Sequence, residues 1–341
     1  MIHDIDFEDA LNLSHPIFID VRTESEYQED HIPVSLNVPI FSDTERKEIG
    51  ITYKNDSPEA ARKLGLNILS PKLPRIIESI EKAGVGKTPV LYCWRGGMRS
   101  RALAAILELM NIHAFRLKGG YKGYRQYINN YFHREKIPFE VIVLYGLTGT
   151  GKTQVIKELV KLGVSAVDLE GLANNRGSVF GNVGLLSQPT QKMFESMLWF
   201  QLHQYRNKKF IVVECESKRI GRITLPPPLF AGMKEGKRIL LFDNISHRIE
   251  RILKEYQVGQ YTQELIEALN KLKNRLGSET MESLVRMINS GSFYTAVETL
   301  LVKYYDPLYN YPDHSSPKYD FSVCSFDEKK AAREILNYLQ P

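Results

Sequence analysis

Residues 146–153, with the sequence GLTGTGKT, place the strongest constraint on what this chain can fold into. They fit the pattern G-x-x-x-x-G-K-[S/T], which forms a phosphate-binding loop when a strand precedes it and a helix follows it. Both flanks fit, because residues 139–145 are an apolar run typical of a buried strand and residues 152–162 have helical spacing. The motif therefore predicts a P-loop α/β unit that binds a di- or triphosphate-like anion. It specifies neither ATP nor hydrolysis.

The P-loop motif also names the candidate ligands. Glycines allow backbone N–H groups to turn toward phosphate oxygens, Lys152 adds a point charge, and Thr153 can hold a magnesium ion. The predicted phosphate- or diphosphate-binding residues are Gly146, Thr148, Gly149, Thr150, Gly151, Lys152 and Thr153. Acidic side chains that end neighbouring strands could serve as a base or bind metal through water, or could equally well cap the following helix. These candidates are Asp168, Glu214 and Glu216.

Apolar runs alternate with helical stretches along the chain, a pattern typical of α/β folds with largely parallel sheets. Before the P-loop, strands are predicted at residues 16–21, 36–39, 89–92 and 114–117, with helices over 70–83 and 100–110. An aromatic, basic connector helix is predicted over 121–138. We therefore expect one α/β domain over residues 1–135 and a second over 136–341.

The second domain is predicted to be a P-loop NTPase-like α/β domain with a helical C-terminal region. Strands are expected at residues 165–168, 210–214, 238–242 and 319–323. Helical periodicity is continuous over 245–301, with Tyr304 to Asp306 ending the run. A final helix is expected over 327–339, with Asp327 near its start.

A second chemical motif, YCWRGGMRS, occupies residues 92–100, again between a predicted strand and a predicted helix. A cysteine in such a loop lies among converging N–H groups and at the positive end of a helix dipole, which favours a reactive thiolate. Arg95 and Arg99 supply forks for an anion, and Gly96 and Gly97 permit a tight backbone cradle. Cys93 is therefore a candidate nucleophile, whereas Cys215 and Cys324 are interpreted as structural.

Composition limits the remaining possibilities. The chain has 341 residues, three cysteines without a C-x-x-C pair, and a net charge of +5. No apolar run approaches the roughly 18–20 residues of a membrane span, and the acidic start resembles no signal peptide, so a reducing cytoplasm is expected. Residues 1–59 are acidic and residues 60–140 basic. This distribution is compatible with a basic face around an anion site or with ordinary solvated surfaces.

The first domain resembles the rhodanese-type sulfurtransferase domains. The residues that carry this resemblance are Asp20 to Arg22, Glu26-Tyr27, His31 to Pro33 and Asn37 to Pro39. Cys93 then lies where that family has its persulfide-forming cysteine. The usual arginine five residues after the cysteine is Met98 here, and Arg99 follows one residue later. A loop one residue longer resembles the phosphatases that share this fold, and it suits an anion such as a phosphate-containing donor.

A rhodanese-like domain fused to a P-loop domain resembles the bacterial tRNA 2-selenouridine synthase family. Further stretches are similar to that family, from about residue 15 to beyond 230. They are residues 45–50, Tyr53-Lys54, 60–65, 93–100, 168–178, Phe180-Gly181, 214–217, 220–222 and Leu225-Pro226. Cys215 occupies a position where an acidic residue is expected, which weakens the case for a metal there.

The resemblance implies a specific reaction. Members replace the sulfur of wobble 2-thiouridine in tRNA with selenium from selenophosphate, through an S-geranyl intermediate made from geranyl diphosphate. Applied here, the P-loop and Lys152 would bind the diphosphate, and Cys93 with Arg95 and Arg99 would act in the selenium step. No tightly bound cofactor is implied, Mg²⁺ can join at the P-loop, and a selenophosphate-producing enzyme would supply the donor.

A tRNA substrate requires a basic surface with aromatic side chains for unstacked anticodon bases. The best candidates for tRNA binding are Arg176, Lys218, Arg219 and Arg222. Lys118, Lys122 and Arg125, interleaved with Tyr121, Tyr124 and Tyr127, could extend this surface or could form an ordinary amphipathic helix. An apolar groove for the geranyl group could be lined by Phe180, Leu185, Leu186, Met193 and Phe194, which are as readily explained as core.

Two other classes of function remain open on sequence alone. A P-loop kinase or ATPase with a rhodanese-like regulatory module would release phosphate from ATP without needing Cys93. A non-catalytic anion-sensing or scaffolding protein is the third class, and the intact Cys93 and Lys152 loops count against it.

Overall fold

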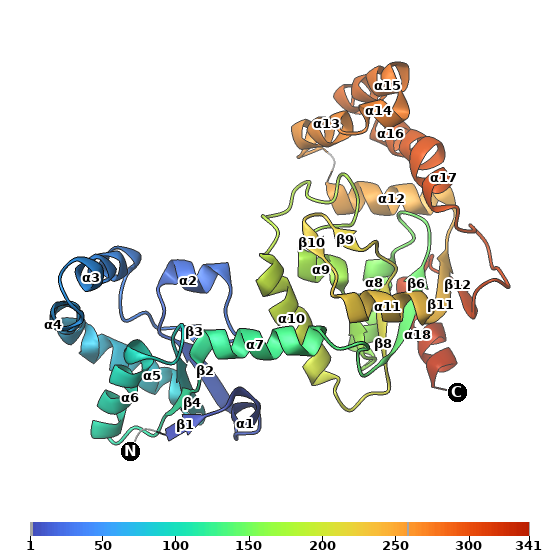
Figure 1. Cartoon of the computed structure of the whole chain (residues 1–341). Helices are drawn as coiled ribbons and strands as arrows, with labels where there is room; N and C mark the ends of the chain where they lie inside the picture. The colour runs from blue at the N-terminus through green and yellow to red at the C-terminus, as the bar shows by residue number, and fades with distance from the viewer. Residues whose placement is uncertain (1–2, 258, 341) are drawn as a thin grey trace. The chain divides into compact units, whose positions relative to one another are not determined.

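Packing divides the chain into two compact units, Met1–Tyr131 and Phe132–Pro341. A computed structural model describes residues 3–257 and 259–340 (Figure 1). Within those residues, no helix has both the length and the apolar character needed to cross a membrane.

The first unit is built on a five-stranded parallel sheet in the order β1-β5-β4-β2-β3. Its strands are β1 (His3–Ile5), β2 (Pro16–Asp20), β3 (Leu36–Asn37), β4 (Thr88–Tyr92) and β5 (Phe115–Leu117). The four strands expected from apolar runs are confirmed. The three-residue β1 was not predicted, because an edge strand this short shows no periodicity.

Seven helices surround this sheet in the described residues. They are α1 (Phe7–Leu11), α2 (Glu24–Glu29), α3 (Asp43–Asn55), α4 (Pro58–Leu69), α5 (Leu73–Gly84), α6 (Met98–Leu109) and α7 (Gly120–Phe132). Helices α2 and α3 begin with capping boxes, Thr23 with Glu26 and Ser42 with Glu45. The predicted extent of the connector helix was wrong, because α7 ends at Phe132, six residues before Pro138. A proline restricts only the residue before it, and the chain must turn earlier to enter the next strand.

The second unit contains a five-stranded parallel sheet in the order β12-β11-β6-β8-β7. Its strands are β6 (Glu140–Tyr145), β7 (Ala166–Val167), β8 (Phe210–Glu214), β11 (Lys237–Phe242) and β12 (Phe321–Cys324). A separate antiparallel pair consists of β9 (Arg219–Ile220) and β10 (Ile223–Thr224). Strand β6, which leads into the P-loop, is central and paired on both sides.

Eleven α-helices belong to the second unit in the described residues. They are α8 (Lys152–Lys161), α9 (Leu169–Ala173), α10 (Gln191–Gln204), α11 (Pro227–Glu235), α12 (Ile245–Tyr256), α13 (Thr262–Asn270), α14 (Lys273–Leu276), α15 (Ser278–Asn289), α16 (Phe293–Leu300), α17 (Asp306–Tyr309) and α18 (Glu328–Leu339). Those from α12 to α17 form a cluster toward the C-terminus. The run predicted as continuous is broken at Gly277 and Gly291, which have positive φ and favour a change of direction. The expected end near Tyr305 was also wrong: a π-helical turn, Leu301–Tyr305, continues into α17, which ends before left-handed Asn310.

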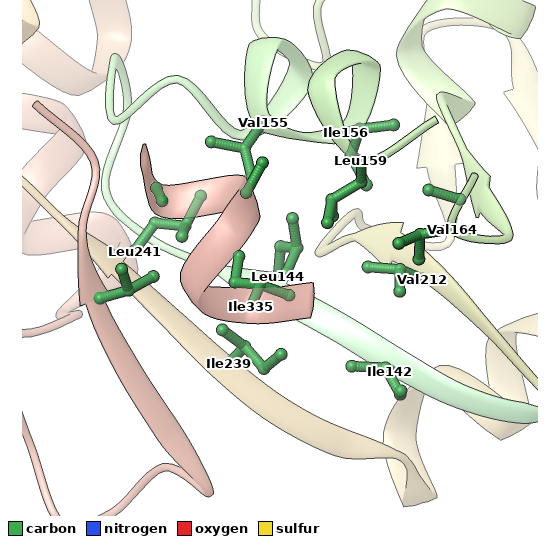
Figure 2. Packing of buried hydrophobic residues seen from close by; sticks show 14 residues of the cluster. Ile142, Leu144, Val155, Ile156, Leu159, Val164, Val212, Ile239, Leu241 and Ile335 are labelled. Atoms are coloured by element: carbon green, nitrogen blue, oxygen red, sulfur yellow. The ribbon is translucent and has the colours of Figure 1, made fainter. Parts of the chain in front are cut away.

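Helices α8 and α18 cover one face of this sheet. Figure 2 shows Val155, Ile156 and Leu159 of α8 packed with Ile335 of α18 over apolar side chains of β6, β8 and β11. Asp327 caps α18 as expected, since its carboxylate accepts a hydrogen bond from Lys330 N. This core fixes the N-terminus of α8, and with it the P-loop, against the carboxyl end of β6.

Candidate functional site

The P-loop has the geometry expected of a phosphate cradle. It runs from the end of β6 to α8, and Gly146, Gly149 and Gly151 have positive φ. The Lys152 Nζ donates to the carbonyl oxygens of Gly146 at 2.9 Å and Leu147 at 3.3 Å, so the ammonium lies across the loop. The Thr150 hydroxyl is buried and donates to Leu147 O at 2.9 Å. Thr150 N also donates to Leu147 O, at 3.3 Å, so both the side chain and the backbone of this residue brace the loop.

Helix α12 holds the outer side of the P-loop with two arginines. Arg248 Nε donates to Thr148 O at 2.8 Å, and Arg251 donates to Gly149 O at 2.6 Å. The helix approaches the loop so closely that a Cβ on Gly149 would lie 2.8 Å from Arg248 O. Arg248 is buried and paired with Asp306, while Arg251 pairs with Asp243 and Glu328. Neither arginine was predicted from the sequence as part of the site.

A cavity of about 310 Å³ lies inside the P-loop. It brings together most of the predicted phosphate ligands and residues from α9, α12 and the chain after α17. The residues that line it are Gly146, Thr148, Gly149, Gly151, Lys152, Thr153, Gln154, Glu170, Arg176, Gly177, Ser178, Cys215, Glu216, Ser217, Ile252, Glu255, Tyr256, Tyr309 and Tyr311. Its size and mixed polar and apolar wall suit an anion carrying a larger organic group.

Two glutamates, Glu170 and Glu216, line this cavity, and the fully buried Glu214 lies next to Glu170. Thr153 donates to Glu170 Oε2 at 2.8 Å, and Glu170 N donates to Glu214 Oε1 at 2.8 Å. Glu170 and Glu216 share a hydrogen bond, which requires one of them to hold a proton. Burial raises the pKa of all three carboxyl groups. The charges of Asp168 and Glu170 add to the shift for Glu214, and the charge of Glu170 adds to that for Glu216. The pKa of Glu216 is raised to about 8, with the Lys152 charge opposing the shift.

The free energy of unfolding of the Glu216→Gln variant is expected to increase relative to that of the wild type as pH rises. Folded Glu216 keeps its proton up to about pH 8, whereas in the unfolded chain this carboxyl loses its proton near the ordinary glutamate pKa of 4.5. The wild-type free energy of unfolding therefore falls between those pH values, and glutamine removes that loss. Urea unfolding of ligand-free protein at pH 5, 6.5 and 8 measures the difference. Glu78→Gln is the control, since the hydrogen bond from Lys82 lowers the pKa of that exposed glutamate. A difference for Glu216→Gln that does not change with pH would contradict the assignment.

Asp168 does not line this cavity. Its carboxylate caps α9 by accepting from Gly171 N at 2.7 Å and pairs with Lys157 at 3.6 Å. Of the two roles considered for this residue, the structure supports helix capping. In the described residues, no group of three or more histidine, cysteine, aspartate or glutamate side chains is arranged to hold a metal ion.

Cys215 was interpreted as a structural cysteine within an apolar strand, and its placement within the strand is wrong. Strand β8 ends at Glu214, so Cys215 lies just beyond it in the cavity wall, with Sγ 3.5 Å from Tyr311 Oη. Burial raises the pKa of its thiol. Cys324 is the last residue of β12 and is exposed.

The cysteine loop of the first unit connects β4 to α6. Cys93 is buried, and its Sγ lies 3.2 Å from Ser100 Oγ. The N-terminus of α7 donates to the loop through Tyr121 N to Cys93 O at 2.8 Å and Lys122 N to Trp94 O at 2.9 Å. The first N–H groups of α7 therefore hold the loop in place, and the N-terminus of α6, which follows the loop, is the helix end suited to binding an anion.

The two candidate arginines of this loop differ in their surroundings. Arg95 is exposed, while Arg99 is mostly buried and pairs with Glu26 at 2.7 Å. Burial acts to raise the pKa of Glu26, but the hydrogen bond from Arg99 and the charges of Arg99 and Arg46 outweigh it, so the pKa is lowered. Glu26 also completes the capping box of α2. The Glu26-Tyr27 motif therefore sets the position of the Arg99 fork.

Gly120→Ala is expected to disrupt the cysteine loop. Gly120 has φ +56°, and a Cβ there would lie 2.2 Å from Cys93 O and 2.4 Å from Gly96 N. The left-handed conformation alone should cost about 1–3 kcal/mol in the free energy of unfolding, and the backbone clash adds to it. Chemical denaturation measures the loss. Gly97→Ala is the matched control, because a Cβ on Gly97 meets nothing within 4 Å. Equal losses in the two variants would show that the contact with Cys93 is unimportant.

The four basic residues proposed for tRNA binding are in different settings. Lys218, Arg219 and Arg222 are exposed around β9. Arg222 also donates to the carbonyl oxygens of Gln188 and Pro189. Arg176 does not lie on that surface: it is half-buried in the cavity wall, 3.1 Å from Glu255 and over the ring of Tyr256.

The suggested aromatic surface on α7 was wrong for two of its three tyrosines. Tyr121 and Tyr124 are buried in the core of the first unit and cannot stack on nucleobases. Tyr121 packs under the guanidinium of Arg22, 4.0 Å from its ring centre, and donates to Asp30. Arg125 lies 3.8 Å from Asp30, and Lys118 pairs with Asp6. The aromatic and basic pattern of this helix therefore reflects packing.

Sequence reasoning missed several residues of the cavity. Glu170 belongs to a stretch that resembles the family, but nothing in its spacing singled it out from Asp168. Tyr256, Tyr309 and Tyr311 come from helical or irregular segments more than a hundred residues after the P-loop. Such residues meet only through the tertiary fold.

Comparisons with known proteins match both units of the chain. Residues 139–340 match the family model of the tRNA 2-selenouridine synthase AAA domain, and residues 5–127 match that of the rhodanese-like domain. The chain is 31% identical to a tRNA 2-selenouridine synthase of Pseudomonas syringae pv. tomato, covering 93% of this chain and 94% of that protein. It is 32% identical to one of Shewanella pealeana, with 87% and 88% covered.

Among solved structures, the shikimate kinase of Acinetobacter baumannii in complex with shikimate is 17% identical, with a TM-score of 0.27, and covers 59% of this chain and 93% of that chain. The two family models confirm the expected succession of a rhodanese-like domain and a P-loop domain with a helical C-terminal region. The relatives match over nearly the whole chain and not over one domain alone. The chain therefore belongs to the tRNA 2-selenouridine synthase family.

Proposed function

We propose that this protein is a tRNA-modifying transferase that converts wobble 2-thiouridine to 2-selenouridine through S-geranyl-2-thiouridine. The observation that carries the proposal is the presence, in one chain of this family, of a P-loop cavity and a separate cysteine loop with its own anion-binding groups. Two different phosphate-containing donors need two such sites. Geranyl diphosphate is assigned to the P-loop, and selenophosphate is assigned to the cysteine loop.

The first step is alkylation at the P-loop. The sulfur of 2-thiouridine attacks C1 of geranyl diphosphate, an S–C bond forms, and the C1–O bond breaks as pyrophosphate leaves with the electron pair. N3 of the base gives up its proton to solvent or to the departing pyrophosphate, which leaves a neutral S-geranyl base. Lys152 and the loop N–H groups stabilise the charge that develops on pyrophosphate. Thr153 Oγ1 and Glu170 Oε2 lie 2.8 Å apart, and these two oxygens could hold a Mg²⁺ ion beside the diphosphate.

The second step is selenation at the cysteine loop. A C2–Se bond forms as the C2–S bond breaks, geranylthiol leaves with a proton, and hydrolysis of the Se–P bond releases phosphate. Alkylation in the first step makes this sulfur a better leaving group. Arg95, Arg99, Gly96 and Gly97 would hold the phosphate of the donor, and Cys93 would act on selenium as nucleophile or carrier.

The reaction can be tested directly on tRNA. The protein is incubated with thiolated tRNA and geranyl diphosphate, with or without selenophosphate, and the tRNA is digested to nucleosides for mass spectrometry. We expect S-geranyl-2-thiouridine without selenophosphate and 2-selenouridine with it. Phosphate release from ATP with no change in nucleoside mass would overturn the proposal in favour of a P-loop kinase or ATPase.

Lys218→Glu/Arg219→Glu is expected to weaken tRNA binding at least tenfold. Both side chains are exposed, Lys218 just before β9 and Arg219 at its first residue, close in sequence to the cavity-lining Glu216 and Ser217. Two lost phosphate contacts should also reduce the dependence of log K on log salt by about two. Filter binding at several salt concentrations measures both quantities. Lys329→Glu/Lys330→Glu on α18 makes the same charge change elsewhere, and an equal loss there would exclude a local tRNA contact.

A further inference from the structure

We propose that an apolar recess in the C-terminal helical region receives the distal end of the donor's hydrocarbon chain and limits its length. This inference rests on the proposed function, because it concerns the same diphosphate donor. The recess is a second cavity, of about 70 Å³, beside the P-loop cavity. Its walls come from α12, α15, α16, the π-helical turn and the loop before Phe180. The residues that line it are Thr148, Ser178, Phe180, Ile252, Tyr256, Leu265, Ile288, Phe293, Ala296, Val297, Leu300, Leu301 and Tyr305.

The recess and the P-loop cavity share one wall. Thr148, Ser178, Ile252 and Tyr256 line both cavities. Thr148 belongs to the P-loop itself, and Ile252 and Tyr256 lie one turn apart on α12, the helix whose arginines hold that loop. Figure 1 shows α12 between the parallel sheet and helices α15 and α16. A ligand whose phosphates occupy the P-loop can therefore extend an attached chain past α12 into the recess.

The chemistry of the recess favours a hydrocarbon over a nucleoside. Beyond its mouth the lining is aliphatic or aromatic, from residues such as Ile288, Phe293 and Leu300. At the mouth, Ser178 and Tyr256 lie 3.3 Å apart and can bond to each other. Apart from the hydroxyls of Ser178, Tyr256 and Tyr305, the side chains there offer few partners to replace the hydrogen bonds that a base or ribose makes with water, whereas an alkyl chain needs none. Apolar cavities of this kind stay dry and bind apolar ligands.

The helical cluster departs from regular α-helix at the wall of this recess. The chain forms a π-helical turn at Leu301–Tyr305, and both end residues line the cavity. Such turns are rare and are frequently found at functional sites. Of the five residues suggested from the sequence for a geranyl groove, Phe180 lines the recess, whereas Phe194 is a buried core residue of α10 and Leu186 is exposed.

The size of the recess implies a limit on chain length. A volume of about 70 Å³ holds the end of a chain, since one water occupies about 30 Å³ in the liquid. The part of the chain nearer the phosphates would lie in the larger cavity, against Ile252 and Tyr256. Leu265, Ile288 and Phe293 belong to the wall of the recess, and in this proposal they are the side chains that stop a longer chain. We therefore expect a ten-carbon donor to be accepted and a fifteen-carbon donor to be rejected.

Two variants test the recess in opposite directions. Ala296→Phe fills it, and should lower the rate of geranyl transfer at least tenfold while transfer from the five-carbon dimethylallyl diphosphate continues. Phe293→Ala enlarges it, and should allow transfer from farnesyl diphosphate. Nucleoside mass spectrometry measures transfer with the three donors. Inhibition by pyrophosphate, which has no chain, should be unchanged in both variants because the P-loop is intact.

The outcomes separate this inference from the proposed function. If the wild-type protein transfers no prenyl group from any donor, the proposed function itself fails. If it transfers geranyl and both variants keep the wild-type order of preference, the recess does not bind the chain and this inference is overturned. Should Ala296→Phe fail to fold, Phe293→Ala decides alone: acceptance of farnesyl diphosphate supports the recess, and continued rejection overturns it.

Discussion

Lys152→Ala is expected to abolish geranyl transfer, and Cys93→Ala is expected to leave it intact while stopping selenation. The Lys152 ammonium lies across the P-loop within 3.3 Å of two loop carbonyls, where it can follow the charge that passes to pyrophosphate. Loss of one such electrostatic group typically lowers the rate about 10²–10³-fold. Cys93 is in the other unit, in a loop with separate anion-binding groups, so its removal should not affect the first step.

The decisive measurement supplies each variant with the product of the other step. Lys152→Ala should convert pre-geranylated tRNA to 2-selenouridine at the wild-type rate, because only alkylation needs the P-loop. Cys93→Ala should accumulate S-geranyl-2-thiouridine when both donors are present. Lys157→Ala is the matched control for charge on α8, since Lys157 pairs with Asp168 outside the cavity. If both variants lost the same single step, the assignment of one donor to each loop would be wrong.

The parts of this fold that sequence reasoning predicted are those with a local signal. The apolar runs of β2, β4, β6 and β8 indicate buried strands, and Asp327 indicates the start of α18, because each pattern depends on residues close in the chain. The helix breaks at Gly277 and Gly291 and the π-helical turn were missed. At those positions the packing of the cluster, rather than the 3.6-residue period, decides where a helix bends.

The candidate site divides in the same way. The P-loop and the cysteine loop are continuous motifs, so their residues could be named directly. Glu170, which bonds to Thr153, and Arg248, which bonds to Thr148 O, reach the P-loop from 17 and 100 residues away. No spacing rule connects such positions. Conversely, Tyr121 and Tyr124 matched a nucleic-acid pattern but are core residues, because burial cannot be inferred from aromatic and basic composition alone.

Arg248→Met is expected to lower the free energy of unfolding by about 2–3 kcal/mol and to weaken pyrophosphate binding. The guanidinium is buried. Its Nε donates to Thr148 O at 2.8 Å, and its two terminal nitrogens donate to the carboxylate of Asp306. Removing one partner of a buried pair typically costs about 3–5 kcal/mol, and the partial exposure of Asp306 reduces that here. Losing the bond to Thr148 O also frees the P-loop backbone, which weakens a ligand held by loop N–H groups.

Asp306→Asn separates these two effects. That variant keeps Arg248 and its bond to Thr148 O while weakening the ion pair, so it should lose stability but bind pyrophosphate nearly as tightly as the wild type. Calorimetry with pyrophosphate and urea unfolding measure the two quantities for each variant. Lys254→Met, an exposed change on the same helix, should alter neither. If Arg248 positions the P-loop, Arg248→Met should lose more affinity for pyrophosphate than Asp306→Asn when the two variants have lost a similar free energy of unfolding. Equal losses of affinity would show that it acts through general stability alone.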